Sequence, residues 1–279
     1  MTSVLEQSRA AEPAASVGRP AAVIRALCSR ELVRFFRQRN RVVGALLQPL
    51  LFWILFAAGL GPTFRMPGQE ASVTYGEYFF PGVVVLIVLF TAIFATISII
   101  EDRREGFLQS VLVAPIPRWA MVLGKLLGGT LIALVQALAF LALGLLVGLQ
   151  FTLLSVLAIS VFLFLLSLAL TGLGFVIAWR MDSTQGFHAI MSVFLMPMWL
   201  LSGAFFPAGE GWLSWVVRLN PLTYGVAGLR RLLYWTAADT LPAQLPSLSV
   251  CWIVTLLFAA VTLTLSWKVA AHRTTGDLL

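Results

Sequence analysis

The stretch EDRREGFLQSVLVAPIPRWAMVLGK, residues 101–125, is a compact charged segment between two long apolar runs. It begins with five ionisable residues in succession, and a Pro-x-Pro at Pro115 and Pro117 precedes its final Gly-Lys pair. Proline cannot continue a helix, so any helix that begins in the charged half must end before Pro115. The segment therefore predicts a short helix bounded by prolines, and the runs around it decide where that helix lies.

If Glu101–Leu112 forms one helix, its acidic residues lie in the first turns, where the helix dipole favours them. The same helix places four apolar side chains on one face: Phe107, Leu108, Val111 and Leu112. So short a helix buries too little apolar surface to fold alone. The residues leave two interpretations open, an ordinary juxtamembrane loop or an amphipathic helix that docks into a partner.

The composition predicts an all-α integral membrane protein. Of the 279 residues, 59% are hydrophobic and 11% are charged, and the mean hydropathy is +0.93. Soluble domains carry about 25% charged residues. The net charge of +7 fits basic residues beside membrane spans better than a nucleic-acid partner, which we do not expect.

Six stretches have the roughly 20 mostly apolar residues that a membrane-spanning helix needs. They are residues 42–61, 79–100, 121–148, 152–178, 189–206 and 250–269. Counting Lys and Arg gives 15 on the side that holds both termini and residues 101–125, and four on the other side. The excess predicts that both termini lie in the cytoplasm.

The amino-terminal region divides into two parts. Residues 1–21 predict a disordered cytoplasmic tail. Residues 24–41 predict an amphipathic helix that lies in the membrane interface, with one face formed by Arg30, Arg34, Arg37 and Arg41. A simple basic flank of the first span is the alternative. Cys28 and Cys251 fall at opposite membrane faces in this topology, so we expect no disulfide between them.

Residues 207–247 form the longest segment on the outer side and interleave aromatic with aliphatic side chains. Two short helices that dip into the outer leaflet fit this pattern, and a small folded cap outside the membrane is the alternative. Pro197 and Gly203 predict a bent or broken helix at the end of the fifth span.

The chain lacks the residues that would let it supply its own energy. The ionisable residues Lys125, His188 and Lys268 lie near span ends, where long side chains can reach water. Carriers coupled to ions usually keep charged groups at membrane depth. Trp119 occupies the position five residues before Gly124 where a phosphate-binding loop needs glycine. We therefore expect no catalytic residues, metal site or cofactor in this chain, and any ATP-driven work requires another polypeptide.

The segment resembles the coupling region of ABC-2 type transporter permeases in its acidic and arginine-rich start, its Gly, its Pro-Ile and its Arg and Gly-Lys. LSGAFFP (201–207) followed by NPLTYGVAGLR (220–230) resembles a second family motif. The arginine-rich start before QPLLFWILF resembles the family's first span. The resemblance covers about residues 22–272. Phe107 and Gln109 depart from it, since a small polar residue and a Glu are common there, a difference that bears on the choice of partner.

The resemblance implies an ABC-2 type transmembrane domain over residues 22–279, with six spans, the interfacial helix and two re-entrant helices in 207–247 before the sixth span. Within the coupling segment, 101–120 and the start of the next span, it implies that these residues couple the chain to an ATPase: Glu105, Gly106, Phe107, Leu108, Val111, Leu112, Pro115, Arg118 and Lys125. Its outer segment carries Gly203, Pro207, Asn220, Pro221, Tyr224 and Arg230.

By the same resemblance, the partners are two copies of an ABC ATPase that binds ATP and magnesium, a second permease copy and membrane lipid, all in a bacterial inner membrane. The expected function is export of an amphipathic or lipid-linked molecule, because the spans carry few charges, and the drug-resistance and lipo-oligosaccharide branch is the nearest one. A permease for polysaccharide, O-antigen or teichoic acid is one alternative. A membrane scaffold or channel is another, although a channel would need a polar pore face.

Overall fold

The computed structural model describes residues 19–61, 74–205, 211–235 and 245–271, and every regular element in these ranges is a helix. The helices are α1 (Pro20–Arg37), α2 (Arg39–Leu60), α3 (Tyr75–Ala95), α4 (Ile97–Arg104), α5 (Phe107–Val113), α6 (Arg118–Leu141), the 3₁₀ helix η2 (Ala142–Val147), α7 (Leu153–Ala178), α8 (Thr184–Leu200), α9 (Trp212–Leu219), α10 (Pro221–Leu233) and α11 (Leu248–Ala271). The predicted all-α class is therefore confirmed.

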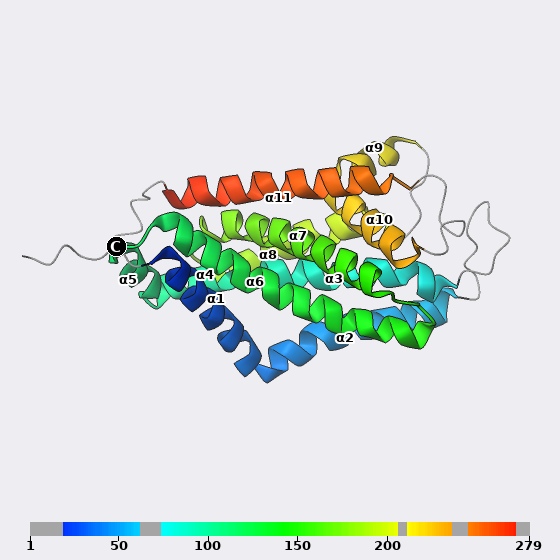
Figure 1. Cartoon of the computed structure of the whole chain (residues 1–279), viewed down its shortest axis with the longest axis horizontal. Coiled ribbons are helices and arrows are strands. Elements are labelled where there is room, and N and C mark those ends of the chain that lie inside the picture. The colour runs from blue at the N-terminus through cyan, green and yellow to red at the C-terminus, as the bar shows by residue number, and fades with distance from the viewer. Residues whose placement is uncertain (1–18, 62–73, 206–210, 236–244, 272–279) are drawn as a thin grey trace, which may run out of the picture.

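The long helices lie side by side in one elongated bundle (Figure 1). One end of the bundle, here named the α5 end, holds the start of α1, the helices α4 and α5, and the last turn of α11. The opposite end, named the α9 end, holds α9 and α10. The coupling segment and the outer segment predicted from the sequence thus lie at opposite ends of the molecule.

Five helical stretches are long and apolar enough to cross a membrane: Arg39–Leu60, Tyr75–Arg104, Arg118–Leu146, Leu153–Ala178 and Leu248–Ala271. The helix over the remaining predicted span is α8, which has 17 residues. A helix of that length covers about 25 Å at 1.5 Å per residue, somewhat less than the hydrocarbon core of about 30 Å. The sixth span therefore stays a prediction.

Helix α3 forms the centre of the bundle, because almost all of its side chains are buried by neighbouring helices. Its N-terminus begins at a capping box, in which the Thr74 side chain accepts from the Glu77 amide and Glu77 accepts from the Thr74 amide. Helix α2 lies at the periphery, and within it only Pro49 is buried. The exposed face of α2 leaves room for lipid or protein outside this chain.

Two of the predicted helices are broken where the sequence suggested continuity. The predicted helix 24–41 is interrupted at Gln38, whose φ of −89° and ψ of 74° are not helical, so Arg41 belongs to α2. The predicted helix Glu101–Leu112 is interrupted at Gly106, whose φ of 76° favours glycine. The expectation that acids lie in the first turns of this helix is wrong, because Glu101 and Asp102 follow the first turn of α4.

Other local predictions are confirmed. Helix α5 ends at Val113, before Pro115 and Pro117, as the proline rule requires. Cys28 and Cys251 are both free thiols. Two short helices, α9 and α10, lie within the predicted outer segment, although their depth in a membrane stays a prediction. The predicted break is not at Pro197, because α8 continues through it to Leu200; the helix ends before Gly203, whose φ is 74°.

Candidate functional site

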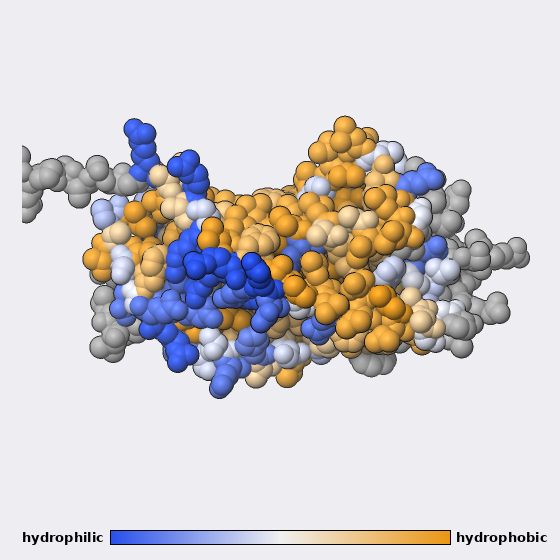
Figure 2. All heavy atoms as spheres, turned by 90° about the horizontal axis from the view of Figure 1, so that it is seen from below, coloured by the Kyte–Doolittle hydropathy of each residue, from blue (hydrophilic) through white to orange (hydrophobic). Residues whose placement is uncertain are grey.

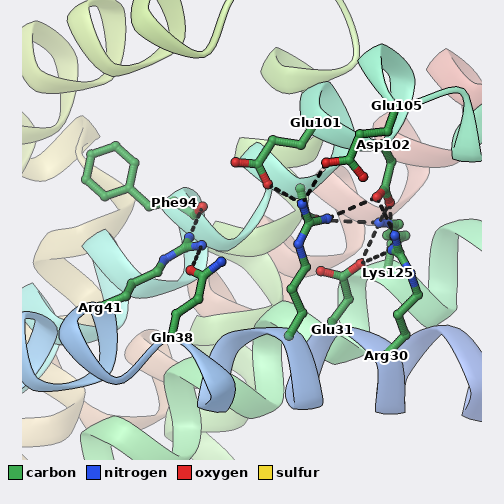
Figure 3. Close-up of polar contacts among 11 residues, drawn as sticks. Arg30, Glu31, Gln38, Arg41, Phe94, Glu101, Asp102, Glu105 and Lys125 are labelled. Atoms are coloured by element: carbon green, nitrogen blue, oxygen red, sulfur yellow. Dashed lines mark hydrogen bonds and ion pairs between the residues drawn. The ribbon is translucent and has the colours of Figure 1, made fainter.

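A buried cluster of charges joins three helices near the α5 end. Asp102 of α4 is fully buried, and Lys125 of α6 is 6% exposed. The Lys125 ammonium lies 2.5 Å from a carboxylate oxygen of Glu31 on α1, and it also forms an ion pair with Asp102. Figure 3 shows these three side chains converging from their separate helices. Each buried charge therefore has a partner of opposite sign, as burial of a charge requires.

Two arginines of α1 complete the cluster. The Arg30 guanidinium donates two hydrogen bonds to Asp102, of 2.7 and 3.0 Å, in the bidentate geometry that makes such pairs strong. Its hydrogen bond with Asp102 raises the pKa of Arg30 above its usual value. Arg34 donates to Asp102 at 3.1 Å and also pairs with Glu101 at 2.9 Å and Glu105 at 3.4 Å. We name these seven side chains the ion cluster: Arg30, Glu31, Arg34, Glu101, Asp102, Glu105 and Lys125.

The ion cluster changes two interpretations of the sequence. Lys125 does not extend toward water from a span end, because Glu31 and Asp102 enclose its ammonium. Arg30 and Arg34 turn toward Asp102 rather than toward lipid headgroups. The signal that could have revealed this was an excess of opposite charges in helices adjoining a membrane, Glu31 and Asp102 against Lys125. Their pairing depends on how α1, α4 and α6 meet, which the sequence does not state.

Close contact between α1 and α6 makes the cluster possible. A Cβ atom on Gly124 would lie 2.9 Å from the Cβ of Leu27, and one on Gly128 would lie 2.6 Å from the Cβ of Glu31. These two glycines, four residues apart, form the small-residue contact by which membrane helices approach closely. Glycine at position 128 therefore lets Glu31 come within reach of Lys125.

Other contacts hold the opposite side of the segment. Arg103, next to Asp102, donates to the carbonyls of Trp179 at 2.7 Å and Met181 at 3.2 Å, after the end of α7. Arg118 donates to the carbonyls of Ala270 at 2.9 Å and Ala271 at 3.0 Å, at the end of α11. Helix α4 is thus fixed to α1 and α6 through Asp102, and to the α7–α8 linker through Arg103.

Helix α5 presents a different surface from the one that its apolar pattern predicts. Leu108 is 3% exposed and packs into the core, and Phe107 lies half-buried beneath the Arg30 guanidinium, 3.8 Å from its ring centre. Val111 and Leu112 are also half-buried. The exposed apolar side chains belong to Val113, Pro115 and Trp119, and Val113 is 81% exposed. Gly106 meets no close neighbour, so its positive φ explains the glycine within this chain.

The remaining arginines of the predicted interfacial face separate. Arg37 is exposed, and Arg41 donates to the Phe94 carbonyl at 2.8 Å. Figure 3 shows Arg41 beside Gln38 and Phe94, apart from the ion cluster. Figure 2 shows hydrophilic side chains gathered over the part of the surface formed by α1 and the start of α2, with hydrophobic ones over much of the rest of this face.

At the α9 end, predicted outer residues hold the turn that follows α8. Arg230 is buried and donates to the carbonyls of Tyr78 at 3.1 Å and Gly203 at 3.4 Å, and Gly203 has a φ of 74°. Asn220 caps α10, in which Pro221 is the first residue, and donates to the Met198 carbonyl at 2.6 Å. Tyr224 donates to the Arg218 carbonyl at 2.9 Å. Pro207 lies outside the described residues.

A cavity of about 790 Å³ lies between α2, α3 and α8, with α1 and α4 at one margin. Most of its lining is apolar, and it includes seven aromatic rings: Phe35, Phe52, Phe56, Phe90, Phe94, Trp199 and Phe205. Its ionisable lining residues are Arg41, Glu101 and His188, which belong to helix segments nearer the α5 end. A hydrophobic lining with a few polar groups at one side is typical of sites for small amphipathic molecules.

Comparison with known proteins assigns the chain to a family. The profile of the ABC-2 type transporter family matches residues 22–234, which include nearly all of α1, the ion cluster, the cavity lining and α10. The chain belongs to the ABC-2 type transporter family. The match spans most of the chain, so the predicted resemblance to this family is confirmed, while the roles of the coupling and outer motifs stay predictions.

Relatives with assigned names agree. The chain is 28% identical to ycf38 of Cyanophora paradoxa over 211 residues, which cover 74% of this chain and 72% of that protein. It is 26% identical to the daunorubicin resistance ABC transporter permease protein DrrB1 of Streptomyces coeruleorubidus over 216 residues, 75% and 74% of the two chains. It is 24% identical over 217 residues to DrrC of Mycobacterium tuberculosis, named for doxorubicin resistance, with 72% and 73% covered. This ABC-2 chain is thus an ABC transporter permease subunit, and ATP hydrolysis belongs to a partner ATPase.

Proposed function

We propose that this permease exports an amphipathic or lipid-linked molecule from the cytoplasm or the inner leaflet of a bacterial cell membrane. The observation that carries the proposal is the cavity between α2, α3 and α8, whose aromatic body and polar margin suit a molecule with the same division. Relatives named for resistance to daunorubicin and doxorubicin support cargo of this general kind. Two permease copies and two ATPase copies would form the working transporter.

The ion cluster supports a mechanism for coupling. Helix α4 is held to α1 and α6 by Asp102 and to the α7–α8 linker by Arg103, so a displacement of α5 passes through α4 to these three parts of the chain by short polar contacts. ATP-driven closure of the partner would move α5, and the bundle would follow. Because α2 is joined to α1 at Gln38, the same displacement would reach the wall of the cavity.

The exposed tip of α5 is the surface that we assign to the ATPase. Val113, Pro115 and Trp119 form its apolar part, with exposed Arg104 and Glu105 at the other end of the segment. An apolar anchor with polar residues around it is the usual composition of a protein interface. A contact of Leu108 with the ATPase, which the family resemblance implies, stays a prediction, and the burial of Leu108 favours a role in fixing α5 against the bundle.

Replacement of Val113 by Asp tests the assignment. We expect the variant to insert in the membrane and fold, because the side chain is 81% exposed. Its affinity for the ATPase should fall by at least roughly tenfold. Arg180→Gln, an exposed site in the α7–α8 linker at the same end of the bundle, is the control and should keep the ATPase. Co-purification of the tagged permease with the ATPase measures the result, and retention of the ATPase by Val113→Asp would refute this surface.

Transport is tested with the complete complex. The permease and its ATPase, reconstituted in sealed vesicles with the ATPase outside, should accumulate an amphipathic dye when ATP is added. A complex that hydrolyses ATP but accumulates none of a panel of amphipathic cations, anions and neutral lipids would contradict export of such molecules.

A further inference from the structure

The cavity and the ion cluster share one side chain, Glu101. It lines the cavity from α4, and in the ion cluster its Oε2 atom lies 2.9 Å from Arg34. Figure 3 shows Glu101 between the Arg41–Phe94 contact on one side and the Asp102–Lys125 contact on the other. This is the only acidic residue among the described residues that line the cavity. A group bound in the cavity would therefore act directly on a member of the ion cluster.

Arg41 and Glu101, which carry opposite charges at the margin of the cavity, differ in how many of their hydrogen-bonding atoms already have partners. The Arg41 guanidinium donates to the Phe94 carbonyl and, at 3.4 Å, to Gln38. Glu101 uses Oε2 for Arg34, while Oε1 makes no hydrogen bond within the described residues, and the side chain is 34% exposed. A carboxylate oxygen is thus free to accept a hydrogen bond from a guest, whereas an anionic guest would have to compete for Arg41.

The aromatic rings of the cavity also favour a positively charged guest. Aromatic faces attract cations through their quadrupoles, and Phe94 and Phe90 lie on α3 about two and three helical turns before Glu101. Most of the lining is apolar and screens charges less than bulk water does, so the attraction between a cation and Glu101 is stronger than in bulk solvent. The cavity therefore combines an aromatic body with a single anionic acceptor.

We propose, building on the proposed function, that the cargo of this permease is an amphipathic organic cation whose positive group binds Glu101 in place of Arg34. Arg34 does not lose all its partners when Glu101 turns to the guest, because Asp102 at 3.1 Å and Glu105 at 3.4 Å remain. The exchange moves Arg34 toward Glu105, which directly precedes Gly106 and α5. Occupation of the cavity is thereby communicated to the coupling segment.

A matched pair of ions tests the inference. Tetraphenylphosphonium and tetraphenylborate have nearly the same shape and opposite charge, and their binding to the detergent-solubilised permease can be measured by calorimetry. We expect tetraphenylphosphonium to bind more tightly. Glu101→Gln should weaken it by roughly ten- to hundredfold, the range for a charged hydrogen bond. Asp182→Asn also removes an acidic group near the α5 end, but Asp182 pairs with Arg103 and lies outside both the ion cluster and the cavity lining, so this variant should keep the affinity.

Equal affinity for both ions, tighter binding of the borate, or an unchanged affinity in Glu101→Gln would overturn the inference. The comparison of the two ions on the unaltered chain needs no variant, so it remains decisive if Glu101→Gln fails to fold. ATP hydrolysis by the reconstituted complex should rise with tetraphenylphosphonium, and less so in Glu101→Gln. If ATP-driven dye export persists without this selectivity, the inference fails and the proposed function stands, whereas absence of any export rejects the proposed function itself.

Discussion

At the scale of single residues, the ion cluster is better explained by the way it fixes the relative positions of three helices than by a contribution to the free energy of folding. Three cationic side chains meet four acidic ones, and Asp102 contacts Arg30, Arg34 and Lys125 at once. The free energy lost when charges are removed from water is often about as large as the free energy gained from their attraction. Apolar residues could therefore have held these helices equally well. A network of directional contacts instead sets one relative position for α1, α4 and α6. That property suits a segment that must transmit movement.

Removal of one member should be costly because its partners stay buried. Lys125→Met leaves Glu31 and Asp102 facing each other without the ammonium between them. We expect the free energy of unfolding to fall by about 3–5 kcal/mol, measured by denaturant titration in mixed micelles. Lys268→Met, at an exposed site on α11, should change it little.

A double variant separates the pairing from packing. Glu31→Gln in the Lys125→Met background removes one of the two acids that have lost the ammonium, so the combined loss should be smaller than the sum of the single losses. Additive losses would mean that Lys125 and Glu31 do not interact in the folded protein, despite the 2.5 Å that separates their charged atoms.

At the scale of the element, the docking of α1 on α6 depends on glycine. Gly128→Ala places a methyl group 2.6 Å from the Cβ of Glu31, so α1 must shift away from α6. We expect a loss of about 1–3 kcal/mol in stability, the usual effect of overpacking. Gly59→Ala on α2 is the matched control, because nothing lies within 4 Å of the added methyl.

The reactivity of Cys28, which lies on α1, can be used to measure a shift of α1 away from α6. Burial raises the pKa of its thiol, so less of the reactive thiolate is present at a given pH. If Gly128→Ala releases α1, the pKa should fall toward its usual value. Maleimide labelling of Cys28 at pH 8, in a Cys251→Ala background, should then become faster. An unchanged labelling rate together with unchanged stability would show that α6 accepts the methyl without displacing α1.

The sequence predicted elements more successfully than their junctions. A segment in lipid must satisfy its own backbone hydrogen bonds, so long apolar runs had to be helices. Prolines fixed the end of α5 for a similarly local reason. No proline or glycine lies at the break at Gln38, so the sequence gives no signal for it. Gly106 does lie at a break, but a glycine can also continue a helix. Leu108 matched a partner-facing pattern, yet its own bundle buries it, since periodicity does not identify which neighbour covers a face.

At the scale of the whole molecule, the bundle separates two kinds of contact. The α5 end carries the ion cluster and the exposed side chains of Val113 and Trp119. At the α9 end, Asn220 and Arg230 donate to the backbone carbonyls of Met198 and Gly203, and these contacts hold the start of the turn after α8. The cavity lies between these ends, so movement at the α5 end can alter its wall while the contacts at the α9 end hold.

This arrangement makes a definite prediction about topology. Ser110 on α5 and Gln150 in the turn before α7 are both exposed, and they lie at opposite ends of α6. In a Cys28→Ser, Cys251→Ala background, a cysteine at position 110 should react with an impermeant maleimide only from the cytoplasm. A cysteine at position 150 should react only from outside the cell, because α6 and η2 carry the chain across the membrane between them. Labelling of position 110 in intact cells would place α5 beyond the reach of any cytoplasmic ATPase, and the coupling mechanism would have to be abandoned.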